Sequence, residues 1–150
     1  MDELKLDRQL CFKLYAASRQ VVRAYKPMLD ALQLTYPQYL VMLVLWEWDE
    51  LAPSQPTVKA LGERLLLDSG TLTPLLKRLQ AAGLVKRRRS DADERKMHLC
   101  LSKEGRELRN RVPALKRQLL CEQGVDSDQL EPLRAQLDVL LRRIAGQLSD

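Results

Sequence analysis

The chain has 150 residues, of which 45% are hydrophobic and 30% charged, so it is long enough to bury a core and polar enough to keep a solvated exterior. Lysine and arginine number 25 against 20 acidic residues, and the formal net charge of +5 fits a polyanion-binding surface without requiring one. The longest apolar run, 39–46, is far shorter than the roughly 20 residues that span a bilayer, and charges interrupt residues 2–8 where a signal peptide would need an apolar core, so we expect a cytoplasmic protein and no membrane partner.

The first predicted element is one long amphipathic helix over residues 7–31. Its apolar side chains recur at three- and four-residue steps from Leu10 to Ala31. Pro27 lies inside this pattern and is expected to distort the last turns, because proline has no amide hydrogen to donate.

A second helix is predicted over residues 36–49. Thr35 and Gln38 form a capping box of the T-x-x-Q type at its start. Its residues are apolar on nearly every side, which is typical of a buried helix, so we expect it at the centre of the fold. A loop is predicted over 50–56.

Two short helices come next, separated by a break at 67–70. The first is predicted over 57–66, and the second runs to Ala82, where Gly83 ends it. Leucines form one stripe of the second helix, and on a helical wheel a face of hydroxyl, proline and cationic residues lies opposite: Thr73, Pro74, Lys77 and Arg78.

The hydrophobic period then changes to two, which is typical of strands. Residues 84–89 and 96–101 are predicted to form a hairpin with a polar tip over 90–95. Cations stand on both sides of that tip, among them Arg87, Arg88, Arg95 and Lys96. Beyond the hairpin, Ser102 caps a helix that should bend near Pro113, and a last helix carries leucines at a/d spacing.

A helix, a tight break, a polar-faced helix and a basic hairpin, in this order, are typical of a winged helix-turn-helix. The polar face can meet base edges while the leucine stripe anchors the helix, and cations on a narrow wing can reach phosphates or the minor groove. Each part alone is more often core packing or a solvated face. Their ordered combination predicts a DNA-binding protein.

Residues 61–105 resemble the core of MarR-type regulators, through the L-x-x-L-x-x-x-G-L pattern, the D-x-D-E-R wing tip and the L-S-x-E-G segment. The resemblance implies a mainly α, single-domain repressor over 1–150, with a winged module at about 37–101. Helices at about 5–35 and 103–148 would join two copies into a homodimer that binds a pseudo-palindromic duplex. It also implies major-groove contacts from Ser69, Gly70, Thr71, Thr73, Lys77 and Arg78, and a minor-groove contact from Arg95.

Residues 10–19, Tyr25 and residues 34–39 together resemble the OhrR branch of organic-hydroperoxide regulators. The resemblance implies that Cys11 senses an organic hydroperoxide and that Tyr25 and Tyr36 hydrogen-bond to it. Cys121 lies where some members carry a second cysteine, which implies an intersubunit disulfide with Cys11. A mixed disulfide of Cys11 with a small thiol stays open.

Helix geometry decides whether Cys11 and Tyr25 can meet within one helix. Cys11 and Tyr25 are fourteen residues apart, which is about 21 Å along a helix at ~1.5 Å per residue. They cannot touch within one helix, so Tyr25 would have to come from a second copy of the chain.

The same sequence bears on other classes of function. The three cysteines, Cys11, Cys100 and Cys121, follow no zinc spacing and His98 is the single histidine, so we expect no metal and no cofactor. With no Cys-x-x-Cys and no βαβ pattern, a thiol peroxidase is disfavoured and no enzyme is expected. A repressor released by a small phenolic or aromatic ligand, and a non-specific nucleoid protein, remain alternatives.

Overall fold

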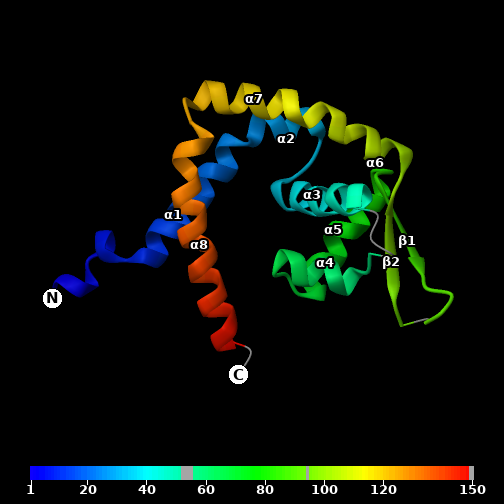
Figure 1. The fold of residues 1–150 in the computed structure, drawn as a ribbon, viewed down its shortest axis with the longest axis horizontal. Helices are drawn as coiled ribbons and strands as arrows, with labels where there is room; N and C mark the ends of the chain where they lie inside the picture. The colour runs from blue at the N-terminus through cyan, green and yellow to red at the C-terminus, as the bar shows by residue number, and fades with distance from the viewer. Residues whose placement is uncertain (52–55, 94, 149–150) are drawn as a thin grey trace.

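The computed structural model describes residues 1–51, 56–93 and 95–148. Its mainly helical chain with one small antiparallel hairpin confirms the predicted fold class. No helix in these three ranges is long and apolar enough to cross a membrane. The elements in chain order (Figure 1) are η1 (Asp2–Leu4), η2 (Leu6–Arg8), α1 (Leu10–Ala24), α2 (Lys26–Leu32), α3 (Tyr36–Leu51), α4 (Val58–Leu65), α5 (Ser69–Ala81), β1 (Val85–Arg89), β2 (Met97–Leu101), α6 (Lys103–Leu108), η3 (Arg109–Arg111), α7 (Val112–Gln123) and α8 (Ser127–Leu148).

The prediction of a single helix over residues 7–31 is wrong. The chain forms two helices, α1 and α2, and Tyr25 stands between them. The amide of Tyr25 still bonds to the carbonyl of Val21 at 3.1 Å, but Pro27 has no amide hydrogen to continue the ladder. Proline similarly divides the helix predicted after Ser102, which consists of α6, η3 and α7 with Pro113 in the first turn of α7.

The central position of α3 is confirmed. The amide of Thr35 donates to Oε1 of Gln38 at 3.0 Å, and the amide of Gln38 donates to Oγ1 of Thr35 at 3.3 Å, which is the predicted capping box. The helix packs against α4, α5 and β2. It ends at Leu51, two residues beyond the predicted end, and residues 52–55 of the predicted loop lie outside the described residues. Its buried side chains are Gln38, Tyr39, Val41, Met42, Val44, Leu45 and Trp46.

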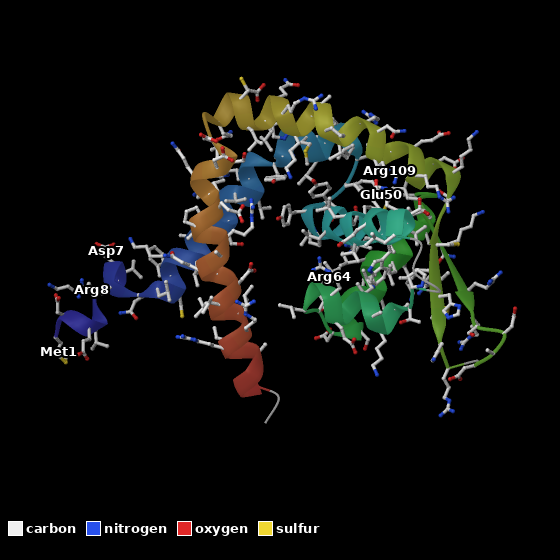
Figure 2. The ribbon with its side chains drawn as sticks, viewed as in Figure 1. Met1, Asp7, Arg8, Glu50, Arg64 and Arg109 are labelled. Carbon is white, nitrogen blue, oxygen red and sulfur yellow. The ribbon has the colours of Figure 1, made fainter. Side chains whose placement is uncertain are left out.

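Ion pairs join the end of α3 to the segment that follows the wing. Asp49 pairs with Arg106 at 3.0 Å, and Glu50 pairs with Arg109 at 3.2 Å. Figure 2 shows Glu50 and Arg109 close together where these elements meet. Exposed pairs contribute little stability each, so their main effect is to orient α6 and η3 on α3.

The terminal helices α1 and α8 are mostly exposed over the residues that the structure describes. In Figure 1 both lie on the side of the molecule away from the hairpin, where α8 crosses α1, and the winged part consists of α3, α4, α5 and the hairpin. No residue of α1 is buried, and Leu133 of α8 is 52% exposed. Isolated helices with an apolar stripe are marginal in water. Much of the apolar surface of these two helices is therefore open to solvent in a single chain.

Candidate DNA interface and thiol site

A tight turn joins α4 to α5. Thr57 caps the start of α4 by accepting the amide of Ala60, and Leu66 ends the helix in the left-handed conformation with φ 57°. The amide of Leu67 then bonds back to the carbonyl of Gly62 at 2.9 Å. A Cβ on Gly62 would lie 2.8 Å from the carbonyl oxygen of Leu67. The turn between the two helices thus requires glycine at this position.

Asp68 fixes the beginning of α5. Its Oδ1 accepts the amide hydrogen of Thr71 at 2.7 Å. Hydrogen bonds, first from the Thr71 backbone and then from its side chain, hold the pKa of the Asp68 carboxyl below its ordinary 3.8. The residue is therefore charged at neutral pH and stabilises the helix start.

The two faces of α5 differ as predicted from the helical wheel. Leu72, Leu75, Leu76 and Leu79 are buried. Thr73 is half-buried, and its hydroxyl donates to the carbonyl of Ser69 at 2.7 Å, so its proton is already used within the helix. The other predicted contact residues of α5 are exposed: Ser69, Gly70, Thr71, Pro74, Lys77 and Arg78.

The wing is an antiparallel pair in which Arg88 of β1 stands opposite His98 of β2. At the tip, buried Ser90 accepts amide hydrogens from Ala92 and Asp93 at 3.2 and 3.3 Å. The side chain of Arg95 is 93% exposed. The wing therefore presents Arg95 to solvent, with its Nε 3.5 Å from a carboxylate oxygen of Asp93. Glu94 of the predicted tip motif lies outside the described residues.

A groove of about 1080 Å³ lies between α4, α5 and the wing. It brings together five of the predicted DNA-binding residues, which are Ser69, Thr73, Arg87, Arg95 and Lys96. The other six predicted residues are exposed but do not line it: Gly70, Thr71, Pro74, Lys77, Arg78 and Arg88. The cations of the groove suit a phosphate backbone, and the carboxylate of Glu63 and several apolar side chains line it as well.

Two residues of this region were missed by sequence reasoning. Lys59 of α4 lines the groove, and Gln80 of α5 accepts a hydrogen bond from Nε of Arg87 at 2.9 Å. Nothing in their spacing separates Lys59 or Gln80 from ordinary solvated residues. Both residues are brought into this region because the wing packs against α4 and α5 in the folded chain.

The residues of the predicted thiol site come from separate parts of the chain. Cys11 is exposed in the first turn of α1, and Tyr25 follows the last residue of that helix. Cys121 is exposed near the end of α7, and Cys100 is exposed on β2. One chain therefore does not bring Cys11 to either of its own predicted tyrosine partners.

Three tyrosines form a cluster at the other end of α1. The rings of Tyr25 and Tyr36 meet edge to face with centroids 5.5 Å apart, and Tyr39 lies 6.1 and 6.3 Å from them. Burial, and next Tyr25, raise the pKa of Tyr36. Burial, with further effects of Tyr25 and Tyr36, raises the pKa of Tyr39 to about 12. Sequence reasoning missed Tyr39, although its position one turn after Tyr36 was an available signal.

Comparisons with known proteins agree with a winged-helix transcriptional regulator. Residues 23–112 match the family model described as transcriptional regulator SarA/Rot. The chain is 44% identical over 143 residues to the organic hydroperoxide resistance transcriptional regulator of Bacillus subtilis, covering 95% of this chain and 94% of that protein.

Among solved structures, the chain is similar to AbfR, a protein of Staphylococcus epidermidis. Reduced AbfR bound to DNA superposes with a TM-score of 0.78 at 29% identity, covering 99% of this chain and 98% of that one. Disulfide-formed AbfR gives a TM-score of 0.62 at 31% identity, covering 99% and 96%. The conformation described here is thus more similar to the reduced, DNA-bound form.

Proposed function

This chain belongs to the MarR-type family of winged-helix transcriptional regulators, and we propose that it is a repressor that releases its operator when an organic hydroperoxide oxidises Cys11. The observation that carries the proposal is the position of Cys11 and the tyrosine cluster at opposite ends of α1, a helix with no buried residue. Two antiparallel copies of such a helix would place each thiol beside the other chain's phenols.

The proposal requires a homodimer. The uncovered apolar residues of α1 and α8, such as Leu10 at 59% and Leu133 at 52% exposed, supply the surface for it. Burying such faces against a second copy stabilises both helices through the hydrophobic effect. A two-fold dimer also presents two grooves, and these suit the half-sites of a pseudo-palindromic duplex about one helical turn apart.

In each half of the dimer, the exposed face of α5 enters the major groove. Ser69, Gly70 and Thr71 bring the start of the helix close to the duplex, and Lys77 and Arg78 contribute cations. Arg95 at the wing reaches the minor groove, whose negative potential favours arginine. This arrangement supplies both backbone and base contacts, which a sequence-specific repressor needs.

The sensing step is a two-electron oxidation of the thiol. The Cys11 thiolate attacks the distal oxygen of the hydroperoxide, the O–O bond breaks, and the alcohol leaves after taking up a proton. Cys11 becomes a sulfenic acid. Phenol donors from the partner's Tyr25 and the partner's Tyr36 would hydrogen-bond to the Cys11 sulfur and hold it in place for this step.

A disulfide would then transmit the oxidation. The thiol of Cys121 from the partner subunit attacks the Cys11 sulfenic acid, an S–S bond forms, and water leaves. Both cysteines are exposed in this structure, so each can reach a second chain. Closing that bond draws α1 toward α7, and this would displace the winged parts and change the half-site spacing. AbfR has been solved both reduced on DNA and with a disulfide formed, and the conformation described here is more similar to the first, which supports assigning it to the reduced, DNA-binding state.

Operator release tests the proposal directly. The reduced protein selects a duplex from a random pool, and fluorescence anisotropy then follows its binding with and without cumene hydroperoxide. We expect peroxide to weaken binding by wild type and by the control Cys100→Ser, and to leave Cys11→Ser bound. Cumyl alcohol, the product, should release none of the three proteins. Release of Cys11→Ser by peroxide, or release of wild type by the alcohol, would favour control by an aromatic ligand instead.

A further inference from the structure

Tyr39 is the buried member of the tyrosine cluster, and its hydroxyl has no partner. The residue is 2% exposed. Within residues 1–51, 56–93 and 95–148, its hydroxyl is the sole buried side-chain polar atom without a hydrogen bond. Leaving such a group unpaired in a protein interior is unfavourable, because the hydroxyl loses its hydrogen bonds to water and gains none in the protein. Phenylalanine would fill the same space without this cost, so packing alone does not account for a tyrosine here.

The position of Tyr39 connects it to both phenols of the proposed thiol site. It follows Tyr36 by one turn of α3, with ring centroids 6.3 Å apart, and its ring lies 6.1 Å from that of Tyr25. Burial first, and then the proximity of Tyr25 and Tyr36, raises the pKa of Tyr39. At neutral pH its hydroxyl is protonated, as in any tyrosine near its ordinary pKa, and can therefore donate a hydrogen bond.

We propose that Tyr39 is a positioning residue of the thiol site, whose hydroxyl donates to the phenol oxygen of Tyr25 or Tyr36 when these tyrosines engage the partner's Cys11. This inference rests on the proposed function. A phenol that accepts one hydrogen bond becomes a stronger donor of its own, because successive hydrogen bonds polarise one another. Tyr39 therefore strengthens the hold of the other two phenols on the thiolate, although it touches neither sulfur nor peroxide.

The experiment compares Tyr39→Phe with its parent in a full-length dimer that carries Cys100→Ser and Cys121→Ser, so that Cys11 is the one thiol. Sulfenic acid formation with cumene hydroperoxide is timed by dimedone trapping across a pH series. Near pH 7 we expect Tyr39→Phe to react about five- to ten-fold more slowly, because the midpoint of its pH–rate profile moves up by up to about one unit. Above both midpoints the two rates should converge.

Two controls separate this role from packing. Met42→Leu alters a fully buried residue one turn further along α3, and it should leave the pH midpoint in place. In a background of Tyr25→Phe and Tyr36→Phe, Tyr39→Phe should have no further effect, because it acts through those hydroxyls.

The outcomes are distinct. An unchanged pH profile in Tyr39→Phe, or an equal shift in Met42→Leu, overturns the inference and leaves the proposed function standing. A parent protein whose Cys11 does not react with hydroperoxide overturns both. A midpoint shift confined to Tyr39→Phe, and absent when the other two hydroxyls are gone, supports the inference.

Discussion

The indole Nε1 of Trp46 donates a hydrogen bond to the backbone carbonyl oxygen of Gly105 at 2.8 Å, and this buried bond joins α3 to α6 across 59 residues of chain. The amide of Gly105 is also engaged, since it donates to Oγ of Ser102 at 3.0 Å. That hydroxyl in turn donates to the carbonyl of Gly83 at 2.6 Å, beside the start of the wing. The central helix, the wing and the segment leading to α7 thus meet at one glycine.

We expect Gly105→Ala to destabilise the protein strongly. A Cβ there would lie 2.2 Å from the carbonyl oxygen of Leu84, a backbone atom that cannot move without displacing the wing. Overpacking of this kind typically costs about 1–3 kcal/mol, and a backbone clash places this variant at the upper end or beyond. Urea unfolding followed by tryptophan fluorescence measures the loss.

Gly70→Ala is the matched control for that prediction. Its Cβ would meet Oδ1 of Asp68 at 3.5 Å, an ordinary contact. Its unfolding free energy should stay within about 1 kcal/mol of wild type, because alanine is the better helix former. Equal stability of both variants would contradict the tight junction at Gly105.

The salt dependence of DNA binding tests whether Arg95 of the wing contacts the DNA. Arg95→Ala removes a cation whose side chain is 93% exposed at the wing. We expect affinity to fall by about ten-fold or more, and the slope of log affinity against log salt to become shallower by about 1.8, because the proposed dimer loses one cation from each wing at about 0.9 apiece. Arg117→Ala removes an exposed cation of α7, outside the groove, and should change neither quantity. An identical slope in Arg95→Ala would remove this residue from the interface.

The cap at Asp68 predicts a pH-dependent stability. Its carboxyl has a lowered pKa in the folded chain because of the Thr71 hydrogen bonds. A lowered folded pKa contributes stability that is present above the unfolded value near 3.8 and is lost as the pH falls through the folded value. Asp68→Asn keeps an acceptor without the charge.

Wild type should therefore be more stable than Asp68→Asn at pH 7 and pH 5, and the difference should shrink toward pH 3. Chemical unfolding at the three pH values measures it. A difference that persists undiminished at pH 3 would assign the effect to side-chain shape rather than to charge.

Non-reducing electrophoresis tests the second thiol. After cumene hydroperoxide treatment, wild type should give a covalent dimer band that Cys121→Ser lacks. Cys100→Ser is the control and should keep the band, because β2 has no part in the proposed pairing. A band absent from every protein, with Cys11 carrying a small thiol by mass spectrometry, would favour the mixed-disulfide route.

The sequence by itself determined the elements whose causes are local. The capping box at Thr35 and the leucine stripe of α5 were predicted from residues within one or two turns of each other. The alternation along the wing is equally local. Such patterns can be recognised in the sequence because capping hydrogen bonds and helix or strand periodicity involve residues that are near neighbours along the chain. The family resemblance added the roles of Cys11 and Tyr25, which no periodicity contains.

Only the tertiary structure decided the relationships between distant segments. The groove that gathers Ser69 and Arg95, the bond from Arg87 to Gln80 and the unpaired hydroxyl of Tyr39 all depend on how helices pack. Pro27 signalled a distortion in this part of the first helix, but the division into two helices at Tyr25 was not predicted, because the apolar spacing continues through it. Contacts of this kind are set by burial and geometry across the whole fold, and a linear pattern of residue types does not encode them.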